Sequence, residues 1–142
     1  MGKVIGIFSA KGGVGKSILA TNLGVAFAAN YPGQTAIIDL HPGLGCVDLL
    51  LDLQPERTWS DLYPVINELT LKHLALSVTR CHDGLDVLAA PKSFRWSNSL
   101  SAEHVIALLE GLRRAYTLVL VDTPTGGGGS NREAYYTSDL RL

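Results

Sequence analysis

The residues most able to do chemistry lie near the N-terminus, where two lysines and a serine alternate with glycines. The segment comprises Lys11, Gly12, Gly13, Val14, Gly15, Lys16 and Ser17. Glycines let consecutive backbone N–H groups turn toward phosphate oxygens, and the N-terminus of a following helix adds partial positive charge. A lysine at the end of such a run can reach the β- and γ-phosphates of a nucleotide, and a serine hydroxyl can bind Mg²⁺. The spacing therefore predicts a phosphate-binding loop.

Two aspartates at the ends of apolar runs could complete a metal site beside that loop. Asp39 follows Thr-Ala-Ile-Ile, and Asp122 follows Leu-Val-Leu-Val. Carboxylates at strand ends can hold Mg²⁺ directly or through water. Each aspartate could instead cap a turn, and the loop could be a glycine-rich turn with incidental lysines. The three motifs together favour a nucleotide and metal site, with Ser17, Asp39 and Asp122 as the metal ligands.

The pattern around these residues alternates between strands and helices. Residues 3–8 and 35–40 are short apolar runs rich in β-branched residues, which is typical of strands buried on both faces. Between them, residues 16–29 have apolar positions at helical spacing. These elements form a βαβ unit whose first strand–helix junction contains the phosphate loop.

Later segments continue this alternation. Short helices are expected over residues 49–53 and 60–69, a longer helix after an N-cap at Ser101, and a last helix over residues 131–138. Strands are expected over residues 85–89 and 117–121, with another beginning within residues 139–142. We therefore predict one α/β domain over residues 1–142, a three-layer sandwich with a mostly parallel sheet and a glycine-rich loop at residues 126–130.

Composition excludes several classes of protein. Of the 142 residues, 46% are hydrophobic, which is enough for a packed core and argues against disorder. Twelve Lys and Arg against thirteen Asp and Glu give a net charge of −1, so no overall field favours DNA or an anionic membrane. We find neither a transmembrane segment nor a signal-peptide layout, and expect a cytoplasmic protein.

The cysteines and tryptophans carry little functional signal. Cys46 and Cys81 lack the spacing of a zinc site or a disulfide framework, so free thiols are expected. Trp59 and Trp96 could anchor an interface, but ordinary packing is the favoured interpretation.

The motifs resemble those of a known family. Residues 9–17, SAKGGVGKS, are similar to the deviant Walker A loop of the ParA/MinD ATPases, and Ile-Ile-Asp at 37–39 and Val-Asp-Thr-Pro at 121–124 stand where that family has its other nucleotide motifs. Residues 84–90, the helix from Ser101 and residues 116–124 are most similar to the branch that includes the CpaE/TadZ pilus-assembly ATPases.

The resemblance implies a P-loop NTPase fold, ATP and Mg²⁺ as cofactors, and a homodimer bridged by ATP. It implies catalytic roles for Lys11 and Lys16, with Lys11 crossing the interface to the partner's phosphates, although Lys11 could simply be a solvated loop lysine. Such a switch would position a cellular assembly of the pilus, septum or partition type through a protein partner. That partner could recruit it to a pole or to the inner face of the membrane. DNA binding is not expected.

The loop differs from the usual Walker A run, because Ala10 stands in place of its first glycine and Lys11 is the extra lysine of the deviant form. The sequence departs from the family pattern at two other residues. Ile18 replaces a threonine that helps to bind the α-phosphate, which could remove about 1.5–3 kcal/mol of nucleotide binding. His41 replaces an aspartate associated with orienting the attacking water, unless it is a loop residue outside the chemistry. The alternative function is therefore a scaffold that binds nucleotide without hydrolysing it.

Length is a further departure. Family members are considerably longer, with further strands that complete the sheet and carry the adenine-recognition residues. We therefore expect a C-terminally truncated domain with an exposed apolar strand edge.

Overall fold

A mostly parallel sheet forms the centre of the molecule. The computed structural model describes residues 1–9, 11–13, 15–43, 45–81, 84–92, 100–126 and 129–142. Across these residues the strand order is β3-β4-β2-β5-β1-β6. The strands are β1 (Lys3–Ile7), β2 (Thr35–Asp39), β3 (Thr79–Arg80), β4 (Leu85–Leu88), β5 (Leu118–Asp122) and β6 (Leu140–Arg141). All pairings are parallel except that of β3 with β4.

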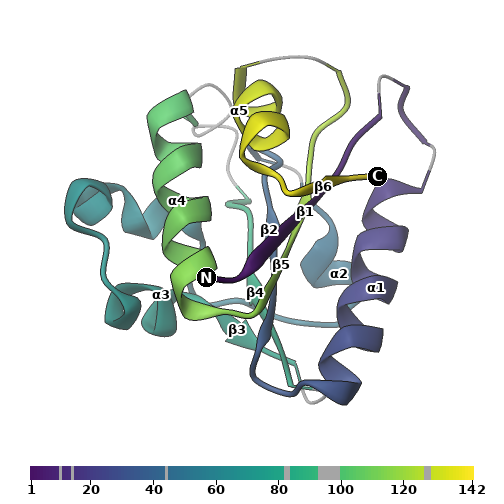
Figure 1. Cartoon of the computed structure of the whole chain (residues 1–142), viewed down its shortest axis with the longest axis horizontal. Helices are drawn as coiled ribbons and strands as arrows, with labels where there is room; N and C mark the ends of the chain where they lie inside the picture. Colours follow the sequence, from purple (N-terminus) through teal and green to yellow (C-terminus); the bar gives the residue numbers. More distant parts are fainter. Residues whose placement is uncertain (10, 14, 44, 82–83, 93–99, 127–128) are drawn as a thin grey trace.

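Helices cover both faces of this sheet and confirm the three-layer architecture (Figure 1). On one face lie α1 (Lys16–Asn30) and α2 (Val47–Leu50). The other face is covered by η1 (Trp59–Glu68), α3 (Leu71–Ser77), α4 (Ala102–Ala115) and α5 (Gly129–Thr137). Because both faces are covered, the central strands are apolar almost throughout, and Ile37, Ile38 and Leu120 are fully buried.

The helix α4 begins as the sequence predicts. The Ser101 hydroxyl accepts a hydrogen bond from the backbone N–H of His104 at 3.2 Å, which satisfies one of the free donors of the first turn. Val105, Leu108 and Leu112 are buried on one side of the helix. Burial of this apolar stripe fixes α4 against the sheet.

The segment between β2 and β4 differs most from the sequence prediction. The helix expected over residues 60–69 is the 3₁₀ helix η1, capped by Thr58 and Asp61 and containing Pro64. Pro64 has no N–H to donate, and its ring disfavours a regular α-helix interior. The helix expected over residues 49–53 begins and ends earlier, as α2. Both α3 and β3 were missed, because each is too short for a periodic signal.

The two edges of the sheet are short strands, β3 and β6. At β6, Leu140 and Leu142 are each about half exposed. Of the glycine-rich loop, Gly126 has a left-handed backbone with φ 103°, while residues 127–128 lie outside the described part of the chain. Trp59 is fully buried, which confirms packing as its role; Trp96 lies outside the described residues. Within the described residues, no helix has both the length and the apolarity needed to span a bilayer.

Candidate functional site

The two predicted aspartates lie side by side because of the sheet register. Asp39 and Asp122 are the last residues of β2 and β5, and they are register partners in that parallel pair. Asp122 is also the register partner of Ile7, the last residue of β1 before the phosphate loop. The carboxyl ends of parallel strands meet at one edge of the sheet, so the chain places both carboxylates beside the loop. Both side chains are almost fully buried.

The phosphate loop needs glycine at two described positions. Gly13 and Gly15 have φ values of 70° and 88°, a left-handed conformation that other residues rarely adopt. Gly15 is the N-cap of α1, and its carbonyl accepts the N–H of Leu19 at 2.9 Å. This is the first hydrogen bond of the helix, so the N–H groups that precede Leu19 in α1 have no carbonyl partner within the helix and can bind an anion. Val14 and Ala10 lie outside the described residues, so the part expected of Val14 stays a prediction.

Lys16 and Ser17 connect this loop to the end of β5. The Lys16 ammonium donates to the Thr125 hydroxyl at 3.0 Å, and the Ser17 hydroxyl donates to Asp122 Oδ2 at 2.6 Å. Thr125 was not singled out from the sequence, although a hydroxyl three residues beyond a strand-end aspartate was available as a signal. The two side chains expected to bind phosphate and metal therefore converge on one place.

His41 lies beside the two aspartates, two residues after β2. Its Nδ1 lies 2.6 Å from Asp39 Oδ1 and 3.9 Å from Asp122 Oδ2, and its backbone N–H donates to Asp39 Oδ1 at 3.1 Å. Burial alone would lower the pKa of His41, but the hydrogen bond to Asp39 and the charges of Asp39 and Asp122 outweigh it and raise that pKa. The imidazole is therefore tied to the two carboxylates.

Three further residues fix the position of Asp39, and none was found from the sequence. The backbone N–H of Val47 donates to Asp39 Oδ2 at 3.3 Å, and the Trp59 indole N–H donates to the Asp39 carbonyl at 2.7 Å. Gly45 lies directly against the carboxylate, since a Cβ added there would be 2.1 Å from Oδ2. Val47 and Gly45 therefore confine the Asp39 carboxylate, whereas Trp59 holds its backbone.

The Asp122 carboxylate is buried and only partly satisfied by hydrogen bonds among the described residues. Burial raises the pKa of Asp122 most, and the charge of Asp39 raises it further, against lowering by the Ser17 hydroxyl. Its Oδ1 is buried and has no hydrogen-bond partner among the described residues. A buried carboxylate oxygen in this condition is suited to accept a cation.

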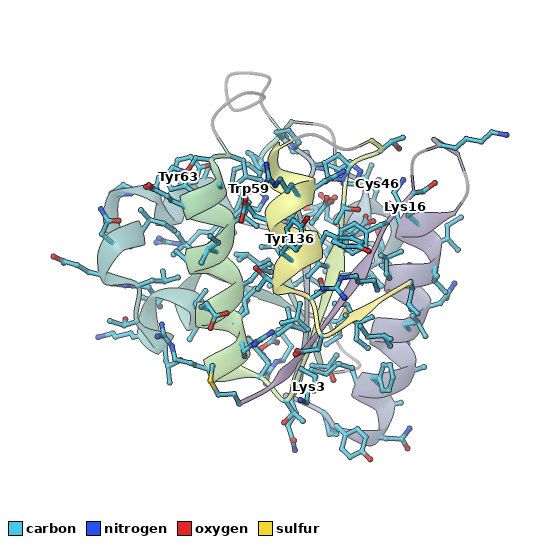
Figure 2. All side chains as sticks on the ribbon, turned by 45° about the horizontal axis from the view of Figure 1, so that its top comes forward. Lys3, Lys16, Cys46, Trp59, Tyr63 and Tyr136 are labelled. Atoms are coloured by element: carbon cyan, nitrogen blue, oxygen red, sulfur yellow. The ribbon has the colours of Figure 1, made fainter. Side chains whose placement is uncertain are left out.

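A cavity of about 410 Å³ lies beside the phosphate loop and His41. It is lined by Gly13, Gly15, Lys16, Ser17, Ile18, His41, Cys46, Leu50 and Thr125. Lys16 and Cys46 lie close together in Figure 2, at the end of the molecule opposite Lys3. Ile18 is 57% exposed and offers no side-chain donor, so it lines the cavity without replacing the expected hydroxyl.

Lys11 and Gly12 are exposed at the loop surface. The backbone N–H of Lys11 donates to the Ser9 hydroxyl oxygen at 3.0 Å. The role of the Lys11 side chain across a dimer interface stays a prediction.

Comparison with known proteins identifies the family. No protein-family model matches the chain. Over 142 residues the chain is 32% identical to the septum site-determining protein MinD of Helicobacter pylori, a match that covers 100% of this chain and 52% of that protein. The chain belongs to the ParA/MinD family. It spans about half the length of the curated relatives it matches.

Solved structures support the fold of this ParA/MinD chain. A ParA family ATPase from Chlorobium tepidum superposes with a TM-score of 0.85 at 22% identity, over 99% of this chain and 58% of that one. The septum site-determining protein MinD from Pyrococcus horikoshii, solved with Mg-ADP, gives a TM-score of 0.80 at 19% identity, over 99% and 56%. The finer likeness to the CpaE/TadZ branch stays a prediction.

The site residues fit the magnesium ion that a P-loop fold implies. Ser17 offers a hydroxyl, and Asp39 and Asp122 offer carboxylates, all of them the hard oxygen ligands that Mg²⁺ prefers. The Oδ1 atom of Asp122, which has no hydrogen-bond partner in the described part of the chain, is the observation that supports a cation here. In chemical terms, the arrangement can bind a phosphate chain and a divalent cation together.

Proposed function

We propose that this ParA/MinD chain provides the nucleotide site of a Mg-ATP-binding switch. One observation carries the proposal: the Lys16 and Ser17 end of the phosphate loop is in hydrogen-bond contact with the β5 end, where Asp122 lies beside Asp39. A loop of this kind binds phosphates through backbone N–H groups and a lysine. The two buried carboxylates beside it offer the hard oxygen ligands that a divalent cation such as Mg²⁺ prefers.

Each of these groups has a distinct task in the proposed site. The Lys16 ammonium would exchange its contact with the Thr125 hydroxyl for phosphate oxygens. The Ser17 hydroxyl, Asp39 and Asp122 would hold Mg²⁺, either directly or through water. When bound, Mg²⁺ neutralises charge on the β- and γ-phosphates.

ATP would join two copies of the chain face to face. In this arrangement the exposed Lys11 would reach the partner's phosphates, where a second cation stabilises charge that develops in phosphoryl transfer. The output would be the position of a cellular assembly, reached through a protein partner at a pole or the inner membrane face. The septum is the favoured assembly, because the Helicobacter pylori relative is named as a septum site-determining protein.

Calorimetric titration with Mg-ATP tests the nucleotide site. Wild-type chain should bind, and Lys16→Ala should not. Lys72→Ala, which removes an exposed lysine on α3, is the matched control and should bind normally. Equal binding by Lys16→Ala and wild type would refute the assignment.

A second function is favoured by His41, which occupies the place of the water-orienting aspartate and is held by Asp39. In this alternative the chain binds nucleotide as a scaffold and does not turn it over. Phosphate-release assays separate the two functions. Sustained ATP-dependent release that Lys11→Ala abolishes would exclude the scaffold, whereas binding without release would exclude the ATPase.

A further inference from the structure

Asp39, His41 and Asp122 together have the composition and spacing of a transition-metal site. One ligand atom from each residue can be chosen so that all three lie within 4.8 Å of one another. Two are carboxylate oxygens on neighbouring strand ends, and the third is an imidazole nitrogen two residues beyond β2. The set therefore combines two oxygen ligands with one nitrogen ligand.

The distances within this set suit a single ion. Two ligands about 2.1 Å from one ion are separated by about 3 Å when adjacent and by about 4.2 Å when opposite. His41 Nδ1 lies 2.6 Å from Asp39 Oδ1, the length of a hydrogen bond, which a shared ion would replace by the slightly longer adjacent separation. It lies 3.9 Å from Asp122 Oδ2, between the two limits. Small side-chain shifts would therefore bring all three atoms to one ion.

Burial supplies a second, independent indication of a ligand. The Asp39 and Asp122 side chains are 1% and 0% exposed, whereas His41 is 25% exposed and forms the open side of the cluster. The Asp122 Oδ1 atom has no hydrogen-bond partner among the described residues. Burial of a carboxylate oxygen without a hydrogen-bond donor costs free energy, because the oxygen loses its hydration. A bound cation would compensate for this cost.

The imidazole decides which cation the cluster prefers. Oxygen-only sites suit Mg²⁺, whereas an imidazole ligand suits first-row transition ions such as Zn²⁺, Co²⁺ and Fe²⁺. The geometry points to a site in this chain that takes a divalent transition-metal ion through His41 Nδ1, Asp39 and Asp122, in preference to Mg²⁺. This inference rests on the nucleotide site proposed above, because the same carboxylates serve both, but it is tested without nucleotide.

Cobalt(II) is the probe, added alone to the purified chain at fixed pH. The d–d absorption reports bound Co²⁺, and proton NMR reports a paramagnetically shifted, exchangeable imidazole N–H when a histidine binds the ion. We expect both signals in the wild type, and we expect Co²⁺ to persist against about a 100-fold excess of Mg²⁺.

His41→Gln should lose the shifted imidazole signal and weaken Co²⁺ binding by about 10- to 100-fold. Glutamine is a polar side chain of similar size at a partly exposed position and can still donate to Asp39, so the variant should fold. His73→Gln is the matched control, because its site is on α3 and glutamine can take over the capping contact that His73 makes with Thr70. This control should leave both signals unchanged.

His41→Asp restores an oxygen-only set and should let Mg²⁺ displace Co²⁺. Any of three results would overturn the inference. The wild type could bind Co²⁺ without an imidazole signal, the imidazole signal could survive in His41→Gln, or the folded wild-type chain could fail to bind Co²⁺. Lys16→Ala separates this result from the nucleotide site, since it should retain Co²⁺ and lose ATP. Retained Co²⁺ in a wild-type chain that binds no ATP would refute the proposed function alone.

Discussion

Gly45→Ala should damage the site without removing any functional group. The added Cβ would lie 2.1 Å from Oδ2 and 2.6 Å from Cγ of Asp39, and real Cβ contacts essentially never fall below 3.0 Å. The carboxylate is short, buried, and held on its other sides by the backbone N–H groups of His41 and Val47. Relief therefore requires the carboxylate to retreat by about 1 Å, or the loop before α2 to move by as much.

The expected loss in affinity follows from that displacement. A misplacement of about 1 Å in a preorganised site can cost about 100-fold, and loss of support behind a metal ligand typically costs 10- to 100-fold. Affinity for Mg-ATP, measured by calorimetry, should therefore fall by about 10- to 100-fold. Urea unfolding of the same sample would show that the variant is folded.

Gly24→Ala is the control for a crowded glycine elsewhere. Gly24 lies in α1, away from Asp39. A Cβ added there would lie 3.1 Å from a terminal carbon of Leu85, and the flexible Leu85 side chain can adjust. Gly24→Ala should bind Mg-ATP normally. Wild-type affinity in a folded Gly45→Ala variant would refute the claim that Gly45 positions the Asp39 carboxylate.

Three other predictions concern stability. Trp59→Phe removes the indole donor to the Asp39 carbonyl and leaves a buried cavity. Urea unfolding should therefore show that the unfolding free energy falls by about 2 to 4 kcal/mol. A fall of less than about 1 kcal/mol would contradict this prediction. Burial, and then the hydrogen bond to Asp86, raise the pKa of the Tyr116 hydroxyl. The unfolded chain therefore loses this proton at a lower pH than the folded chain does, and the unfolding free energy falls as the pH rises above about 10. Tyr116→Phe should flatten that fall in unfolding measurements between about pH 9 and 11, and an unchanged slope would count against it. Burial also raises the pKa of Asp122, so above the ordinary value of 3.8 its ionised form destabilises the folded chain. Asp122→Asn should therefore increase the unfolding free energy at pH 7 in EDTA, while abolishing cation binding. A lower unfolding free energy in this variant would contradict the reasoning.

The part of the site that comes from strand ends could be predicted from the sequence. Asp39 and Asp122 each follow an apolar run, and parallel strands bring such residues to one edge of the sheet whatever their order. The phosphate loop was equally accessible, because Gly13 and Gly15 carry the left-handed backbone that glycine spacing indicates. Local pattern and sheet topology were sufficient for these residues.

Residues that act through tertiary contacts could not be predicted in this way. Trp59 reaches Asp39 from 20 positions away, and Gly45 matters only because a buried carboxylate lies against it. Thr125 meets Lys16 across 109 residues. No periodicity or propensity encodes such contacts, since they depend on how β5 and the loops pack.

The strand order also determines when this sheet can form as the chain is made. The first two strands, β1 and β2, do not pair with each other; β5 lies between them and pairs with both. Until residues 118–122 have left the ribosome, two strongly apolar strands have no common neighbour, and the early chain exposes surfaces prone to aggregation. Because contacts of long sequence separation slow folding, the joining of β1 to the β2–β4 pair through β5 should come late. Synthesis of β5 is therefore the step that commits the chain both to its fold and to its pair of aspartates.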